Sequence, residues 1–267
     1  MKIGIFDSGL GGLTVARAIV DTLPTFDMIY FGDTARTPYG SKSRETVIQY
    51  ACENTELLIQ KGAEIIVMAC NTAASVATDI LRKNYDIPIF EVISPAAALV
   101  SSFTHARRVG IIGTRATINS NVYTNKISQQ RPDIQVHAMP CPLLVPLVEE
   151  GWLNKPETRM IVKKYLHPLK VRQVDTLILA CTHYPILKSI IQKKIGRRVR
   201  VIDSAEAVAQ QLMTYFKENN FQQDANKQGT CHFYVSDITP HFEKIAQSIF
   251  KRKIDLQVTR YTGALSL

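Results

Sequence analysis

Two stretches of the chain end in a cysteine in the same local setting, and their residue types could do chemistry. Residues 66–72 read IVMACNT and residues 177–183 read LILACTH. In each stretch an apolar run of strand character ends in Ala-Cys and is followed at once by small polar residues. A buried strand that ends just before a helix delivers its last side chains to the edge where open α/β sheets bind ligands. Cys70 and Cys181 are therefore candidate reactive thiols, and the matched pair indicates a site that treats two faces of one substrate alike.

The residues after each cysteine favour the ionised thiol. Helix-start residue types follow both cysteines: Asn71 and Thr72 follow the first, and Thr182, His183 and Pro185 follow the second. Asn and Thr are good helix caps, and Pro suits the first helical turn. A thiol at a helix start faces free N–H groups and the positive end of the helix dipole, which both favour the thiolate. The same N–H groups can hold a substrate carboxylate.

Thiolates act as nucleophiles or as bases, and the pairing favours a base. A Cys–His hydrolase pairs one cysteine with one histidine and an orienting group. His183 follows Cys181 by two residues, but Cys70 has no matching histidine, so a hydrolase leaves one cysteine unexplained. Two thiols on opposite sides of an α-carbon suit removal of a proton from one face and delivery to the other. The residues therefore favour racemisation.

Strand and helix patterns alternate along the whole chain and must position these cysteines. Alternation of this kind predicts parallel sheets covered by helices on both faces. Apolar runs predict strands at residues 2–6, 28–31, 64–68, 87–93, 108–112, 134–138, 174–179 and 199–202. Helical periodicity falls between them, for example at residues 43–61, 73–84, 157–170, 185–195 and 204–218.

A weak internal duplication accompanies the two cysteines. Residues 2–8 (KIGIFDS) resemble residues 108–114 (RVGIIGT), and the cysteine follows at a similar distance in both halves. An acid also precedes each cysteine at a comparable distance, Asp33 in the first half and Glu149 in the second. We interpret this as two similar three-layer α/β domains, with mostly parallel sheets, that are related by an approximate two-fold axis. The cysteine-bearing strand ends would face each other across a cleft between the domains.

Composition limits the class of protein. The chain has 267 residues, of which 46% are hydrophobic and 21% charged, as is ordinary for a globular protein. No apolar stretch approaches a membrane span, and the N-terminus reads as a strand and not as a signal peptide, so we expect a cytoplasmic protein with no membrane partner. The five cysteines are scattered without a Cys-x-x-Cys pair, which disfavours disulfides and a structural zinc site.

The net charge of +9 raises the question of nucleic acid. The basic residues cluster at 193–200 and at 251–253 without interleaved aromatics, and no RNA- or DNA-recognition motif is present. We therefore expect a solvated basic surface, and association with nucleic acid or a DNA-handling enzyme is not predicted.

Six motifs in order resemble the glutamate racemases of the aspartate/glutamate racemase superfamily, and the resemblance runs essentially end to end. Together they are far more specific than any one alone, since residues 9–12 taken alone would pass for a weak phosphate loop. The motifs are residues 6–15 (FDSGLGGLTV), 32–40 (GDTARTPYG), 69–73 (ACNTA), 113–117 (GTRAT), 146–149 (PLVE) with Gly151, and 181–185 (CTHYP).

The resemblance implies a role for each matched position. Cys70 and Cys181 would be the two proton donors and acceptors, one for each enantiomer of glutamate. Asp7 would assist Cys70, whereas Glu149 and His183 would assist Cys181; Asp33 would have an auxiliary role. The residues implied in holding the substrate are Asp7, Ser8, Tyr39, Gly40, Asn71, Thr72, Thr114, Thr117, Thr182 and His183.

The resemblance also carries expectations about the whole molecule. It implies catalysis without cofactor or metal, supply of D-glutamate for bacterial peptidoglycan, and a homodimer as one assembly. It implies a first domain of residues 1–94 with 206–267 and a second domain of residues 95–205. Because the chain begins directly at the first predicted strand, we expect no activation by a cell-wall precursor of the kind that depends on an N-terminal extension.

Three alternatives stay open at the level of sequence. A racemase for aspartate or another amino acid would carry the same twin thiols, since these report chemistry and not side-chain length. A binding or regulatory protein could use the basic surface. A hydrolase with a cysteine nucleophile is the third.

Overall fold

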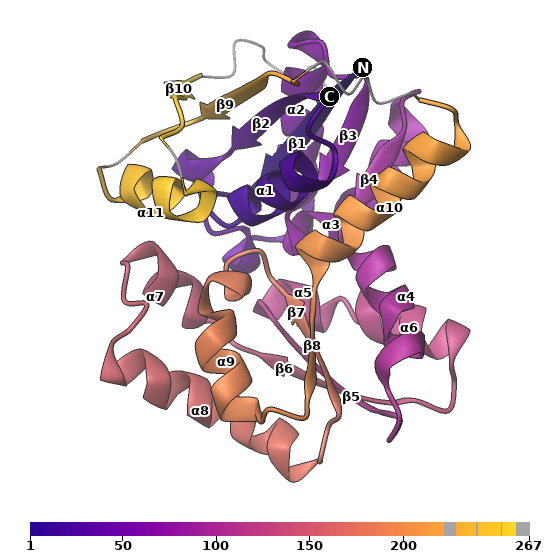
Figure 1. Ribbon diagram of the computed structural model, residues 1–267, viewed down its shortest axis with the longest axis vertical. Coiled ribbons are helices and arrows are strands. Elements are labelled where there is room, and N and C mark those ends of the chain that lie inside the picture. The colour runs from indigo at the N-terminus through magenta and orange to yellow at the C-terminus, as the bar shows by residue number, and fades with distance from the viewer. Residues whose placement is uncertain (222–227, 239, 252, 260–267) are drawn as a thin grey trace.

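The computed structural model describes residues 1–221, 228–238, 240–251 and 253–259, and they form two α/β units stacked end to end (Figure 1). Each unit is built on a sheet in which every strand pairing is parallel. The first sheet has the order β10-β9-β2-β1-β3-β4 and contains β1 (Lys2–Asp7), β2 (Asp27–Gly32), β3 (Ile65–Met68), β4 (Ile89–Glu91), β9 (Cys231–Val235) and β10 (Leu256–Val258). The second has the order β6-β5-β7-β8 and contains β5 (Arg108–Gly113), β6 (Gln135–Pro140), β7 (Thr176–Ala180) and β8 (Arg200–Asp203).

Helices cover both faces of each sheet, as the alternating pattern predicted. On the first sheet α1, α10 and α11 pack on one side, and α2 packs with α3 on the other. On the second sheet α8 packs with α9, and α4 packs with α6. The helices are α1 (Gly12–Thr22), α2 (Arg44–Gln60), α3 (Asn71–Asn84), α4 (Ile93–Phe103), α5 (Arg115–Asn119), α6 (Val122–Gln130), α7 (Leu144–Glu149), α8 (Pro156–Val171), α9 (Lys188–Ile195), α10 (Ser204–Glu218) and α11 (Pro240–Phe250), with 3₁₀ turns η1 (Thr34–Arg36), η2 (Tyr39–Ser41) and η3 (Tyr184–Leu187).

The two sheets repeat one another, which confirms the predicted duplication. The order β2-β1-β3-β4 of the first sheet matches β6-β5-β7-β8 of the second. The register matches too, because Gly4 lies beside Ile66 and Gly110 lies beside Leu177. Ile66 lies four residues before Cys70, and Leu177 lies four residues before Cys181. The strands β3 and β7 are buried along their whole length, as expected of central strands covered on both faces. Cys70 and Cys181 therefore follow equivalent strands, β3 and β7, at equivalent positions in the two sheets.

The predicted pairing of Asp33 with Glu149 is wrong. Asp33 follows β2 directly, and its N–H bonds to the last carbonyl of β1; the residue in that place in the second half is Cys141, which follows β6 and bonds to the carbonyl of Gly113. Glu149 instead ends the short helix α7, beyond that position. The two acids lie at similar distances along the chain but at different places in the fold.

All eight predicted strands are present, and two further strands extend the first sheet. Strand β9 pairs with β2, and β10 pairs with β9, so both lie at one edge of the sheet. Among the described residues no helix is both long and apolar enough to cross a membrane.

Candidate active site

Cys70 and Cys181 open onto the same small space between the two units. Cys70 follows β3 and caps α3, whereas Cys181 follows β7 and precedes η3. Both side chains are buried. A space of about 20 Å³, here named the inner cavity, lies between them, and its lining is Ser8, Pro38, Tyr39, Gly40, Cys70, Asn71, Thr72, Thr114, Val145, Cys181, Thr182 and His183. The two thiols predicted to act together therefore do line one cavity.

The Cys70 side of the inner cavity is enclosed. The thiol donates a hydrogen bond to Ser8 Oγ at 3.6 Å. Burial, with the charge of Asp7 as a second cause, raises the pKa of Cys70 to about 12, although the N–H of Ala73 and the hydroxyl of Ser8 oppose the shift. The sequence predicted the opposite effect from the helix start. The correction has a physical reason: desolvation of a thiolate outweighs the dipole of the first helical turn.

Asp7 is fully buried beside this thiol. Its Oδ2 accepts the N–H groups of Gly9 at 3.0 Å and Gly12 at 2.9 Å, and its Oδ1 accepts the Thr182 hydroxyl at 3.2 Å. Burial raises the pKa of Asp7, against the lowering effects of His183 and of these hydrogen bonds. A carboxyl group with a raised pKa next to a thiol is suited to hold or return a proton there.

The Cys181 side contains a chain of three ionisable groups. Cys181 Sγ lies 3.9 Å from His183 Nδ1, and His183 Nε2 lies 3.2 Å from Glu149 Oε1. Burial alone would lower the pKa of His183, but the contacts with Cys181 and Glu149 outweigh it and raise the pKa to about 10. The ring therefore binds a proton more strongly than a free imidazole does, and in the protonated form it can stabilise a Cys181 thiolate. Thr37 supports the chain by donating to Glu149 Oε1 at 3.3 Å.

His183 should make stability depend on pH. Its pKa rises from 6.5 to about 10 on folding. Below pH 6.5 both states hold the proton and the stabilisation is complete; as pH rises toward 10 the unfolded chain has lost the proton that the folded protein keeps, so the stabilisation is lost. We expect the difference in unfolding free energy between wild type and His183→Gln to shrink over this range, by at most about 1.4 kcal/mol per pH unit. Urea unfolding at several pH values measures it, and a difference that stays constant would contradict the assignment.

Asn71 offers a free donor in the inner cavity. Its Oδ1 accepts the hydroxyl of Tyr123 at 2.7 Å, while its buried Nδ2 has no hydrogen-bond partner within the described structure. A buried N–H group without a partner is costly, and a substrate carboxylate would satisfy it. Tyr123 orients this amide and was missed by the sequence analysis, because nothing in the motifs links residue 123 to residue 71.

Three threonine hydroxyls form a triangle across the two units. Thr72 Oγ1 lies 3.0 Å from Thr114 Oγ1 and 3.3 Å from Thr117 Oγ1, and Thr114 lies 3.0 Å from Thr117. Thr72 and Thr114 line the inner cavity, whereas Thr117 is not part of the lining and bonds to both from behind. The structure therefore places Thr72 and Thr114 at the inner cavity and Thr117 behind them.

Tyr39 and Gly40 reach the inner cavity on a turn that Asp33 holds. The Tyr39 hydroxyl donates to Asp33 Oδ2 and accepts from Asn54 Nδ2 at 3.0 Å, so this hydroxyl is engaged within the protein. Asp33 also accepts from Arg36 Nε at 2.7 Å and from Ser236 Oγ at 3.1 Å. Asp33 thus supports the turn and is not part of the lining of the inner cavity.

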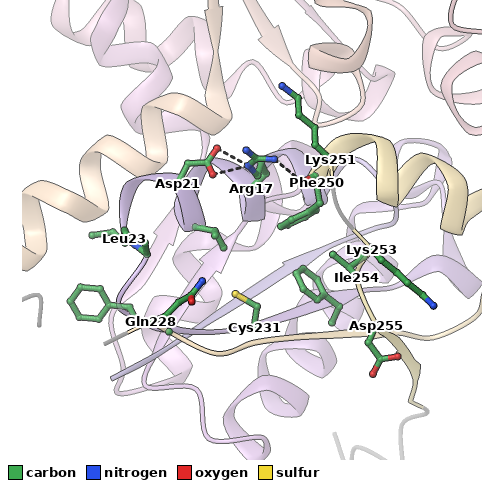
Figure 2. Close-up of a pocket in the computed structure, with 15 residues that line it drawn as sticks. Arg17, Asp21, Leu23, Gln228, Cys231, Phe250, Lys251, Lys253, Ile254 and Asp255 are labelled. Carbon is green, nitrogen blue, oxygen red and sulfur yellow. Dashed lines mark hydrogen bonds and ion pairs between the residues drawn. The ribbon is translucent and has the colours of Figure 1, made fainter. Parts of the chain in front are cut away.

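Further cavities lie outside this site. One of about 260 Å³, here named the outer cavity, is lined by Gly9, Leu10, Thr34, Thr37, Glu149, Glu150, Asp237, Phe242 and Ile245. Another of about 560 Å³ lies between α1, β9 and α11 (Figure 2). Figure 2 shows Cys231 pointing into it, but Arg17 is paired with Asp21 there and the described lining contains no histidine. The larger space therefore does not reproduce the acid–base groups of the inner cavity. Within the described residues no cluster of His, Cys, Asp or Glu is arranged to hold a metal ion.

Comparison with known proteins agrees with the fold and shows the family to which the chain belongs. Residues 5–212 match the family model described as Asp/Glu/Hydantoin racemase. The chain belongs to this family of racemases. It is 45% identical over 257 residues to the glutamate racemase of Persephonella marina, an alignment that covers 96% of each chain.

Solved structures give the same result. The glutamate racemase isoform RacE1 from Bacillus anthracis superposes with a TM-score of 0.92 at 36% identity, over 97% of each chain. The glutamate racemase from Francisella tularensis, solved in complex with D-glutamate, superposes with a TM-score of 0.90 at 36% identity, over 98% of each chain.

Proposed function

We propose that the protein is a glutamate racemase that interconverts L- and D-glutamate with two cysteines and without a cofactor. The observation that carries this proposal is the meeting of Cys70 and Cys181 on one cavity, at equivalent strand ends of two repeated sheets. Relatives that match nearly the whole chain are named glutamate racemases. The resemblance in sequence and the geometry support the same chemistry.

The mechanism uses the two thiols in opposite roles. One cysteine, as a thiolate, removes the α-proton from one face of the substrate, and the other cysteine, as a thiol, donates its proton to the opposite face of the carbanion. The reverse reaction exchanges the roles. His183 and Glu149 assist Cys181, whereas Asp7 assists Cys70. The Asn71 amide and the backbone N–H groups at the start of α3 would bind the substrate carboxylates.

Substrate entry requires the two units to move apart. The inner cavity of about 20 Å³ offers roughly the space of one water molecule, far less than an amino acid needs. Hydrogen bonds that join the units close it: Thr182 to Asp7, Thr14 to the Thr182 carbonyl, Tyr123 to Asn71, and the threonine triangle. We expect these contacts to open when glutamate enters and to re-form around it.

Circular dichroism of the substrate tests the substrate preference. We expect loss of circular dichroism signal from L-glutamate and from D-glutamate, ending at the racemic mixture, and little change with L-aspartate. A faster reaction with aspartate would reject glutamate as the substrate and would leave the two-thiol chemistry standing. Trapping of a covalent acyl-enzyme would favour the hydrolase.

Several wider statements belong to the same proposal. D-Glutamate made by this enzyme would enter peptidoglycan, so expression should restore growth of a bacterial strain that requires D-glutamate. The enzyme would act in the cytoplasm and could assemble as a homodimer, which sedimentation equilibrium measures. We keep residues 1–94 with 206–267 and residues 95–205 as the two domains; α10 begins at the second sheet and packs against α1 of the first unit, which supports this division.

A further inference from the structure

The inner and outer cavities share one wall. In three pairs of residues that are adjacent in the chain or joined by a hydrogen bond, one member lines the inner cavity and the other lines the outer cavity. Ser8, Pro38 and His183 line the inner cavity, and their partners Gly9, Thr37 and Glu149 line the outer cavity. The wall between the substrate site and the outer cavity is therefore one residue thick.

A chain of polar contacts runs through this wall, from the Cys181 thiol to the outer cavity. Cys181 Sγ is 3.9 Å from His183 Nδ1, and His183 Nε2 is 3.2 Å from Glu149 Oε1. The His183 side chain is only 2% exposed, whereas that of Glu149 is 29% exposed. Glu149 is thus the group through which a buried thiol–imidazole pair reaches the outer cavity. Two further carboxylates, Glu150 and Asp237, line that cavity and could accept a proton in turn.

The Cys70 side reaches the outer cavity less directly. Its acid, Asp7, is fully buried, and the hydrogen bonds to its oxygens come from two backbone N–H groups and the Thr182 hydroxyl. Backbone amides do not relay protons under ordinary conditions, so the link from Asp7 runs through the Thr182 hydroxyl, which lies 3.5 Å from His183 Nδ1. The two thiols therefore face one substrate, and Cys181 has the shorter connection to the outer cavity.

We propose that the outer cavity is the proton exit of Cys181, reached through His183 and Glu149. This inference rests on the proposed racemase function, because a two-thiol enzyme must restore the protonation of both thiols after each net conversion. The step starts from a neutral His183 ring that carries its proton on Nε2: Cys181 Sγ gives its proton to His183 Nδ1, the Nε2 proton passes to Glu149 Oε1, and Glu149 releases it to water in the outer cavity. The ring then carries its one proton on Nδ1. Reversal of these transfers protonates the thiolate.

Rescue of Glu149→Ala by formate tests the exit. The substitution removes the carboxylate next to a cavity of about 260 Å³, which has room for a small acid. We expect kcat to fall at least about tenfold and high concentrations of formate to raise it again about tenfold, with KM unchanged. The matched control is Asp7→Ala, which also removes an assisting acid but lies outside the lining of the outer cavity. Formate should leave its kcat unchanged. Glu149→Gln keeps the side-chain size and should lose activity without being rescued.

Three outcomes would overturn the proposal. Formate could fail to raise kcat of a folded Glu149→Ala, could rescue Asp7→Ala equally, or could act only as a competitor that raises KM. The last result would indicate that formate binds in place of a substrate carboxylate and not beside His183 in the outer cavity.

A measurement without substrate separates this inference from the proposed function. Nitrogen-15 NMR reports the protonation of His183, which faces Cys181, Glu149 and the charge of Asp7. In Glu149→Ala the pKa of His183 should fall, and formate should raise it again; in Asp7→Ala formate should have no effect. If wild type fails to racemise glutamate, the proposed function fails, but this titration still decides whether the outer cavity communicates with His183.

Discussion

Replacement of either Cys70 or Cys181 by serine is expected to abolish racemisation. A serine hydroxyl is a far weaker acid than a thiol, so neither proton removal nor delivery proceeds at a useful rate through it. Loss of one positioned acid or base typically costs 10² to 10⁴-fold in rate, and we expect a loss of about 10³-fold or more in kcat for each variant. We expect kcat to fall in both variants because each turnover uses both thiols. Stopped-flow or long-time circular dichroism with both enantiomers measures the residual rate.

The control for this prediction is Cys52→Ser. Cys52 is half-buried in α2 and lies outside the lining of the inner cavity, so its replacement should leave kcat within about twofold of wild type. Retention of racemisation by Cys70→Ser or Cys181→Ser would contradict a requirement for two thiols. Equal loss in all three variants would show general damage to the fold.

Gly11→Ala is expected to inactivate the enzyme while leaving the fold intact. A Cβ at Gly11 would lie 2.4 Å from Thr182 Oγ1, 2.5 Å from His183 Nδ1 and 2.7 Å from the His183 backbone nitrogen. These contacts join the two units, so the methyl group holds the units apart and displaces His183 from Cys181. The backbone of Gly11 (φ −59°, ψ −33°) suits alanine, so the site itself adds no strain. We expect kcat to fall at least 100-fold with a change in Tm of a few degrees.

Gly196→Ala is the matched control with the opposite pattern. Gly196 has φ +125°, where an L-residue is strained, and an added methyl group would have Val199 Cγ2 as its nearest neighbour, at 3.9 Å. It ends α9, away from the inner cavity, so alanine should cost about 1–2 kcal/mol of stability and leave kcat unchanged. Normal activity of Gly11→Ala would show that the close approach of the two units is not needed for catalysis.

The central strands and the site were predictable because they obey local rules. Buried parallel strands read as short apolar runs, and the similarity of residues 2–8 to 108–114 predicted the repeat that the register of Gly4 and Gly110 confirms. The strands β9 and β10 were not predicted. They lie at the edge of the sheet and are less buried, so their sequences lack the continuous apolar pattern. The helix α11 was missed as well.

Contacts between distant segments set the limit of the sequence analysis. The motifs identified Asn71 but not Tyr123, which orients it from the other unit, and Asp33 but not Asn54, which shares Tyr39 with it. The pKa of the Cys70 thiol shows the same dependence on contacts between distant segments. A helix start alone predicts a lowered thiol pKa, whereas the burial that raises it depends on how the two units close. Thr37 and Pro38 lie inside a motif that the sequence analysis identified, residues 32–40. That motif could have indicated that both residues lie near the site.

The most direct test of the account is exchange of the α-proton in D2O, with L- and D-glutamate offered separately to wild type, Cys70→Ser and Cys181→Ser. The two-thiol mechanism predicts that wild type places deuterium at the α-carbon of the product from either enantiomer. Neither variant should racemise, and any α-proton exchange that each retains should concern opposite enantiomers. If both variants exchange the same enantiomer, or if wild type leaves both untouched, the central claim that Cys70 and Cys181 serve opposite faces of glutamate is contradicted.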